Sequence, residues 1–486
     1  MTPRSWRPRA AVVLCAALVL GASACSGEAG DDRASEPTGQ PTAAPDAWPA
    51  PPADRPVVDL TYSFGEDLSK VSGTEKVTFT PNREVCELVF RAWPNKPATA
   101  RYGNSLTVRT VKVDDKDLPL NVSAAGAPAD SPGTLVTASL PNCSPAGRAV
   151  NASLAFDLTL GARTDERIGY SPRERIAWMG SGYPMLAWSQ RDGWVRDAAV
   201  DVVGETTTSE AFELRSLEVE APEHFAVAAI GDADEPRAAR GDGRLVHRFH
   251  AEVVRDVTVT VGEIELTSTP TDVGTITVAL PRSGRTRADA KEWTDASRKA
   301  LEDLSKLLGP VPADHLWVSV LPHVSEGVEY GQAIQVGDVD PDKDRWLVVH
   351  EFAHLWFYGL VGNNQARDPW LDESFTTYAQ EIVAPAGMTQ NRRRIVEGEV
   401  GRSMGQWADQ RRADSSYVDT TYGAGGQALL DARAAAGPSA FDAAIRAYLR
   451  DRAWQIATPQ DVSDALKGLP RAQEILREAG ALREGA

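Results

Sequence analysis

Residues 350–354 of the chain read His-Glu-Phe-Ala-His, inside an apolar stretch that runs from residue 346 to residue 358. The stretch predicts a buried helix, in which residues four apart share a face. His350 and His354 can therefore present two imidazoles to one zinc ion. Glu351 lies beside them and can reach a metal-bound water as general base. Because the chain has only seven histidines among 486 residues, this pattern arises by chance with odds of about one per cent or less.

A catalytic zinc site needs a third protein ligand, and the sequence offers one downstream. The motif type with a third histidine is excluded, because Phe357 and Leu360 occupy its glycine and histidine positions. Residues 359–364 interrupt the helix, and Asp368 followed by a proline predicts the N-cap of a second helix. If the two helices run antiparallel, Glu373 lies level with the histidines. Two histidines, a glutamate and a water form a catalytic zinc set with an open position.

These segments resemble one family, the gluzincin aminopeptidases, the group of aminopeptidase N and leukotriene hydrolase. Its motif is His-Glu-x-x-His, then eighteen residues, then Glu within a Trp-Leu-Asn/Asp-Glu segment. The spacing from His354 to Glu373 and the context at residues 370–376 both match it. Similarity at residues 88–95 and 182–187 extends the resemblance over most of the chain. It implies a β-saddle domain before a thermolysin-like domain, and one zinc ion per chain.

The resemblance also implies a site for the free α-amine of a peptide substrate. The family has a Gly-x-Met-Glu-Asn segment upstream of the zinc helix, whose glutamate binds this amine. Residues 326–330 read Glu-Gly-Val-Glu-Tyr, so Glu329 takes that place. Glu326 is its rival, or a second anion at the same subsite. The chain departs from the family pattern at Glu326, Val328 and Tyr330.

A tyrosine of the family, in a Tyr-x-Lys-Gly segment before a helix, donates to the oxyanion. Tyr422 matches this position, with Ala424 in the place of the lysine. Tyr417 is a nearby competitor. The resemblance therefore implies that Tyr422 is a catalytic residue beside Glu351.

Composition and pattern predict a multidomain α and β protein. The chain is 42% hydrophobic and 24% charged, which excludes a fibrous or wholly disordered chain. Its net charge of −17, with no dense Lys/Arg block, argues against nucleic acid as a partner. Short alternating strands predict an antiparallel β-rich domain over residues 55–278, and helical spacing predicts a mainly helical catalytic domain over residues 279–486. The expected elements are strands at 57–64, 75–80, 88–93, 105–113, 257–264, 315–321 and 328–336, and a helix at 286–308.

The first residues predict export. Residues 1–24 have the basic start, apolar run and small-residue cleavage site of a secretory signal peptide. Cys25 follows at once and resembles the lipidated cysteine of bacterial lipoproteins; the alternative is ordinary secretion. Residues 25–54 are expected to be a disordered tether on the outer side of the cell membrane. Cys86 and Cys143 are then expected to pair in an oxidising compartment.

The sequence therefore predicts a lipid-anchored zinc metallopeptidase that faces outward. The leading hypothesis is an aminopeptidase with peptide substrates, a membrane contact through the lipid only, and no nucleic-acid partner. One alternative is a zinc endopeptidase of the same fold, if Glu329 does not face the cleft. Another is a zinc-containing binding lipoprotein without turnover, against which the intact Glu351 argues.

Overall fold

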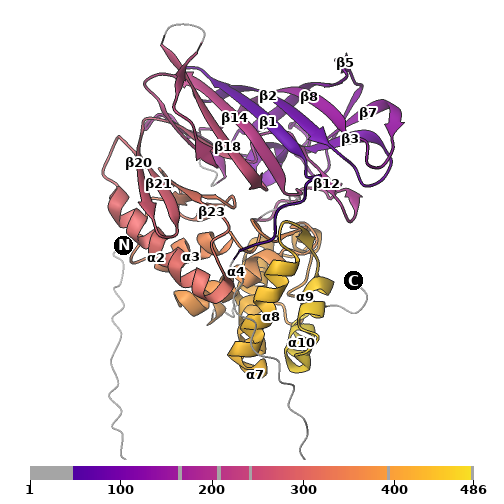
Figure 1. Ribbon diagram of the computed structural model, residues 1–486, viewed down its shortest axis with the longest axis vertical. Helices are drawn as coiled ribbons and strands as arrows, with labels where there is room; N and C mark the ends of the chain where they lie inside the picture. Colours follow the sequence, from indigo (N-terminus) through magenta and orange to yellow (C-terminus); the bar gives the residue numbers. More distant parts are fainter. Residues whose placement is uncertain (1–46, 163–166, 205–208, 240–242, 391–393, 483–486) are drawn as a thin grey trace, which may run out of the picture. The chain divides into compact units, whose positions relative to one another are not determined.

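The computed structural model describes residues 47–162, 167–204, 209–239, 243–390 and 394–482 (Figure 1). The predicted signal peptide and the predicted lipidation site at Cys25 lie outside these residues. Among the residues described, no helix combines the length and the apolar character needed to cross a membrane.

The N-terminal part is rich in β-strands. Its largest sheet, in spatial order, contains β16 (Asp232–Ala233), β18 (Arg244–Val254), β14 (Phe212–Pro222), β1 (Val57–Phe64), β2 (Lys70–Phe79), β8 (Val150–Thr159), β4 (Ser105–Val113) and β5 (Lys116–Asp117), with β17 (Arg237–Ala238) paired to β18. A second sheet contains β15 (Ala226–Ala229), β19 (Thr258–Gly262), β10 (Ile176–Gly180) and β9 (Ile168–Ser171). A third contains β11 (Met185–Leu186), β3 (Val85–Arg91), β7 (Leu135–Ser144) and β6 (Leu120–Ser123), beside the hairpin of β12 (Trp188–Ser189) and β13 (Gly193–Trp194). Short helical turns follow β3 at η1 (Trp93–Asn95) and α1 (Pro97–Ala100).

Alternation of side chains explains the largest sheet. In β1, the residues Val58, Leu60, Tyr62 and Phe64 are buried and their neighbours are partly exposed, as a strand with one face on a core requires. The prediction of an antiparallel domain holds for most strand pairs. It is wrong for β1 and β14, which run parallel.

The predicted disulfide is present. Cys86 in β3 is bonded to Cys143 in β7, and these strands are hydrogen-bonded neighbours in one sheet. The bond therefore joins two adjacent strands of the N-terminal part.

The catalytic part has a five-stranded sheet covered by helices. Its strands, in spatial order, are β20 (Ile264–Thr271), β21 (Gly274–Pro281), β22 (His315–Leu321), β24 (Ala333–Gly337) and β23 (Gly327–Glu329). Its helices are α2 (Ala290–Leu308), α3 (Arg345–Ala353), α4 (Trp370–Val383), η2 (Met388–Gln390), α5 (Met404–Ala408), α6 (Ala413–Tyr417), the π-helix η3 (Val418–Ala424), α7 (Gly425–Ala436), α8 (Pro438–Asp451), α9 (Pro459–Ala465) and α10 (Pro470–Glu478). Strands β25 (Gly362–Asn363) and β26 (Ile456–Ala457) pair beside them.

The predicted domain boundary at residues 278 and 279 is wrong, because it falls inside β21. Strands β20 and β21 form a hairpin, and β21 pairs with β22 in the sheet of the catalytic part. The N-terminal part therefore ends near Gly262. Alternation identifies a strand but does not say which sheet the strand joins.

The end of the predicted tether is attached to the catalytic part. The indole nitrogen of Trp48 donates to the carbonyl oxygen of Pro310 at 2.8 Å, and that of Trp454 donates to Pro49 at 2.8 Å. The Trp48 side chain also packs against the core of the catalytic part. A disordered tether therefore extends at most to the residues before Trp48.

Candidate metallopeptidase site

Two helices carry the predicted zinc ligands. Helix α3 is shorter than the apolar stretch predicted: it ends at Ala353, and His354 is its C-cap residue. Helix α4 begins at Trp370 after Pro369, so Asp368 is not its N-cap as the sequence predicted. Glu373 lies in the first turn of α4.

The three predicted ligand atoms converge. The Oε2 atom of Glu373 lies 3.4 Å from Nε2 of His350 and 3.6 Å from Nε2 of His354. Two atoms that bind a tetrahedral zinc ion at about 2.0–2.1 Å lie roughly 3.3–3.4 Å apart. All three side chains are buried, and Oε2 of Glu373 has no hydrogen-bond partner among the described residues. This donor set fits a zinc ion.

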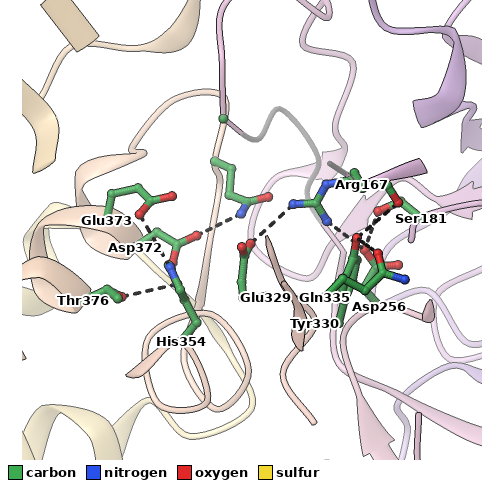
Figure 2. A network of polar contacts seen from close by, with 12 residues as sticks. Arg167, Ser181, Asp256, Glu329, Tyr330, Gln335, His354, Asp372, Glu373 and Thr376 are labelled. Atoms are coloured by element: carbon green, nitrogen blue, oxygen red, sulfur yellow. Dashed lines mark hydrogen bonds and ion pairs between the residues drawn. The ribbon is translucent and has the colours of Figure 1, made fainter. Parts of the chain in front are cut away.

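A buried carboxylate orients one of the imidazoles. The Nδ1 atom of His354 lies 2.7 Å from Oδ1 of Asp372, and the other carboxylate oxygen accepts a hydrogen bond from the amide of Gln365 at 2.9 Å (Figure 2). The hydroxyl of Thr376 lies 3.3 Å from the same Nδ1. With Nδ1 engaged, Nε2 of His354 faces Glu373, as a metal ligand must.

The electrostatics of the cluster also suit a cation. Burial lowers the pKa of His350 to about 3, and the charge on His354 adds to this effect. Burial favours neutral His354 as well, but Asp372, Glu373 and Glu329 outweigh it and raise its pKa. Burial raises the pKa of Glu373 to about 7, against the influence of His354. The acids around His354 therefore favour a positive charge at this point of the site, which a bound zinc ion would supply.

The predicted general base lies where an edge strand crosses the zinc helix. Glu351 is only 4% exposed, and one of its oxygens lies within 4.8 Å of ligand atoms of Glu329 and His354. Strand β23 approaches so closely that a Cβ atom at Gly327 would lie 2.5 Å from the carboxyl carbon of Glu351. Only glycine fits at residue 327 without displacing this carboxylate.

Glu329, the predicted amine-binding residue, is buried at the same crossing. It is 5% exposed, and its Oε1 atom lies 3.5 Å from Nη2 of Arg167, a residue of the N-terminal part (Figure 2). Burial raises the pKa of Glu329, and the charges of His354 and Arg167 oppose that rise. Its carboxylate therefore has a cation beside it and faces the predicted zinc site.

All the predicted site residues of the catalytic part line one cleft of about 540 Å³. The residues in question are Glu326, Glu329, His350, Glu351, His354, Glu373 and Tyr422. Glu326 is exposed, whereas Glu329 is buried next to the zinc ligands. The geometry favours Glu329 over its rival as the inner carboxylate.

A π-helix places the two candidate tyrosines together. In an α-helix, residues five apart point in different directions, but the hydrogen bonds of a π-helix such as η3 join residues five apart, and α6 runs directly into it. The rings of Tyr417 and Tyr422 consequently meet edge to face at 5.6 Å. The ring of Tyr422 is stacked on that of His350, with 5.9 Å between the ring centres. Tyr417 is buried behind Tyr422 and does not line the cleft.

Sequence reasoning missed three contributors to this site: Arg167, Gly327 and Asp372. Only Asp372 had a local signal, because it directly precedes the predicted third ligand. Adjacent helical residues point about 100° apart, so Asp372 and Glu373 do not face the same point. Asp372 contacts a histidine instead. Arg167 had no signal, because its partner is distant in the chain.

The comparisons with known proteins agree with this geometry. Residues 340–478 match the family model for the peptidase family M1 domain. Aminopeptidase N of Streptomyces lividans is 29% identical over 137 residues, which make up 25% of this chain and 16% of that protein. The chain thus aligns with only a small part of this curated relative. The catalytic part is therefore similar to the M1 peptidases, in agreement with the gluzincin motifs.

Solved structures extend the similarity in fold to both parts of the chain. The M1 zinc metallopeptidase from Deinococcus radiodurans matches with a TM-score of 0.61 and 16% identity, over 88% of this chain and 94% of that one. A mutant of it bound to a Tyr-Ser-Ala substrate matches with a TM-score of 0.61 and 15% identity, over 89% and 95%. The β-rich part followed by a helical part is therefore the architecture of these two-domain enzymes.

Proposed function

We propose that this chain is a zinc-dependent aminopeptidase that removes N-terminal residues from peptides. The observation that carries the proposal is the convergence of His350, His354 and Glu373 on one point of the cleft, with Glu351 and Glu329 beside them. Aminopeptidase N is among the proteins similar to this domain, and a similar fold has been solved with a tripeptide substrate.

The chemistry follows from the residues of the cleft. A zinc ion held by His350, His354 and Glu373 would lower the pKa of a bound water and polarise the peptide carbonyl. Glu351 accepts the proton of the attacking water and can pass it to the leaving amine. The hydroxyl of Tyr422 donates a hydrogen bond to the developing oxyanion.

Glu329 restricts cleavage to the first peptide bond by binding the substrate's free amino terminus. A buried carboxylate forms a charge-assisted hydrogen bond with the substrate's ammonium group. Because Glu329 is fixed close to the zinc ligands, it sets the distance from the free amine to the scissile carbonyl. An internal bond of a peptide has no ammonium group at that distance.

A substrate comparison tests this function directly. Aminoacyl fluorogenic substrates should be cleaved, their N-acetylated forms should be poor substrates, and removal of zinc with a chelator should abolish cleavage until zinc is restored. Equal cleavage of free and acetylated substrates, or cleavage of internal bonds first, would favour the endopeptidase alternative. Zinc binding without cleavage of any peptide would favour the binding lipoprotein.

We further propose that the enzyme acts outside the cytoplasmic membrane, anchored by lipid at Cys25. The proposal rests on the signal peptide pattern and on the cysteine that follows it. Cys25→Ala should release the protein from the membrane fraction without preventing export, because the cleavage signal remains. If wild type and variant are both recovered as secreted, membrane-free protein, the lipid anchor is wrong and the secreted alternative holds.

A further inference from the structure

A buried cation from the N-terminal part contacts Glu329, the carboxylate proposed to bind the substrate's amine. Arg167 is 3% exposed, and its guanidinium lies between two buried carboxylates, Glu329 in β23 and Asp256 in the connection between β18 and β19 (Figure 2). Its Nη2 atom is 3.5 Å from Oε1 of Glu329, and its Nη1 atom is 3.8 Å from Oδ2 of Asp256. Asp256 is itself held by the hydroxyl of Ser181 and by the backbone N–H of Val257 at 2.6 Å.

Two aromatic rings fix the plane of this guanidinium. Its central carbon lies 5.1 Å from the ring centre of Trp93 and 5.0 Å from that of Tyr330. The hydroxyl of Tyr330 donates to the side-chain oxygen of Gln335 at 3.0 Å, so this ring is fixed as well. Tyr330 stands where the gluzincin pattern has Asn, so this departure supplies a ring that stacks on Arg167.

Arg167 stabilises the buried carboxylate of Glu329. Burying a carboxylate is costly without a cation beside it. The guanidinium of Arg167 lies within 3.8 Å of both Asp256 and Glu329. Loss of this guanidinium would therefore weaken the support of the Glu329 carboxylate.

We propose that Arg167 is a positioning residue for recognition of the substrate's free amine: it fixes the Glu329 carboxylate in its charged, cleft-facing orientation. This inference rests on the proposed aminopeptidase function. Because Arg167 is buried and contacts carboxylates on both sides, it acts through Glu329 rather than by touching the substrate. Amine recognition thereby depends on a side chain of the N-terminal part.

Arg167→Met tests the proposal, because methionine is long and apolar but has no charge. The measurement is kcat and KM on an aminoacyl fluorogenic substrate and on its des-amino analogue, which has the same acyl group without the amine. The preference for the free amine should fall about tenfold or more, mainly through a rise in KM for the amine substrate, since a buried charge pair is broken. Cleavage of the des-amino analogue should change little.

Two further measurements separate positioning from a loss of folding. Arg91→Met is the matched control: Arg91 is also buried in the N-terminal part, but it donates to the backbone carbonyl oxygens of Asp197 and Val195, whereas Arg167 contacts the Glu329 carboxylate. Its preference for the free amine should equal that of wild type. Arg167→Lys keeps one charge without the planar fork, so it should restore part of the preference even if the Met variant does not fold.

Calorimetry on zinc-free protein provides a reading that does not depend on turnover. A free-amine tripeptide should bind wild type more tightly than its acetylated form, and this difference should shrink in the Arg167 variants.

The outcomes separate this inference from the proposed function. If wild type prefers the free amine and Arg167→Met or Arg167→Lys keeps the full preference, the role of Arg167 is overturned and the aminopeptidase function stands. An equal loss in Arg91→Met also overturns it, because the effect would then be structural. If wild type shows no preference for the free amine, both proposals fail.

Discussion

The proposed zinc side and the proposed amine side of the cleft are built in different ways. On the zinc side, α3 and α4 supply His350, His354, Glu373 and the orienting Asp372 from one short segment of the chain. On the amine side, edge strand β23 supplies Glu329, and a residue from the distant N-terminal part supplies its cation. The first side is set by helix geometry, and the second depends on how the two parts of the chain pack.

This difference predicts different responses to substitution. Ligands one helical turn apart keep their spacing as long as the helix forms, so damage on the zinc side should appear as lost zinc or lost chemistry. A carboxylate on an edge strand keeps its place only while its neighbours hold it, so damage on the amine side should appear as altered substrate selection. The following predictions test that contrast.

The largest effect should come from Glu351→Gln, on the zinc side. The variant keeps its shape and its zinc but cannot accept the proton of the attacking water, so kcat should fall by about 10²–10⁴-fold. Steady-state kinetics with zinc analysis measures this. Glu326→Gln is the control, as an exposed carboxylate of the same cleft, and should be nearly silent. A Glu351→Gln enzyme with full activity would contradict the mechanism.

Tyr422→Phe should have the next largest effect. Loss of an oxyanion donor typically lowers kcat by about 10²–10³-fold, with little change in KM. Tyr417→Phe removes the hydroxyl of the neighbouring tyrosine. This variant should lower kcat much less than Tyr422→Phe does, because Tyr417 does not line the cleft. A larger loss in Tyr417→Phe than in Tyr422→Phe would exchange the roles of the two tyrosines.

On the amine side, Glu329→Ala should lower kcat/KM on free-amine substrates by about 10²-fold or more. The reason is the loss of a buried charge pair, which costs about 2–5 kcal/mol, and of the contact that places the scissile bond. KM should rise and kcat should fall together, and the zinc content should equal that of wild type. If Glu326→Ala gives the large loss and Glu329→Ala is silent, the two carboxylates exchange roles.

A moderate effect is expected from Asp372→Asn, which weakens the support of His354 without removing a ligand. Zinc affinity should fall about 10–100-fold, as is usual when such a partner is lost. Competition with a chelator measures it. Thr376→Val, which removes the weaker contact to the same Nδ1 atom at 3.3 Å, should have a smaller effect. Unchanged zinc affinity in Asp372→Asn would show that the ring orientation does not depend on this carboxylate.

The smallest effect is expected for Asp256→Asn, whose Tm should depend on pH differently from that of wild type. Asp256 contacts Arg167, the cation beside Glu329. Burial raises the pKa of Asp256 from 3.8 to about 6, against the influence of Arg167. Because the pKa of Asp256 is higher in the folded state than in the unfolded state, this carboxyl group contributes to stability when it is protonated. Its contribution is fully present below pH 4 and is lost as pH rises through about 6. Asparagine does not titrate and does not lose stability in this way. The Tm of Asp256→Asn minus the Tm of wild type should therefore rise between pH 4 and pH 8, by a few degrees at most. A Tm difference that is independent of pH would contradict this shift.

Local patterns predicted much of the fold. The strands at 57–64, 105–113 and 315–321 have the predicted bounds, because alternation or an apolar run over a whole strand is a strong signal. The helix predicted at 286–308 begins later, at Ala290, where Asp289 forms a capping box with Glu292. The edge-like strand predicted at 328–336 is instead the pair β23 and β24, joined by a turn at Gly331 with φ of +79°.

By itself, the sequence located the candidate zinc half of the site: two histidines at helical spacing, Glu373 on the next helix, and Glu351 as the predicted base beside them. These features are local, since a helix fixes which residues share a face whatever surrounds it. Only the tertiary structure decided that β20 and β21 join the catalytic sheet, that Gly327 lets an edge strand reach Glu351, and that Arg167 lies against Glu329. Such contacts depend on packing between distant segments, and neither composition nor periodicity records which distant side chains meet.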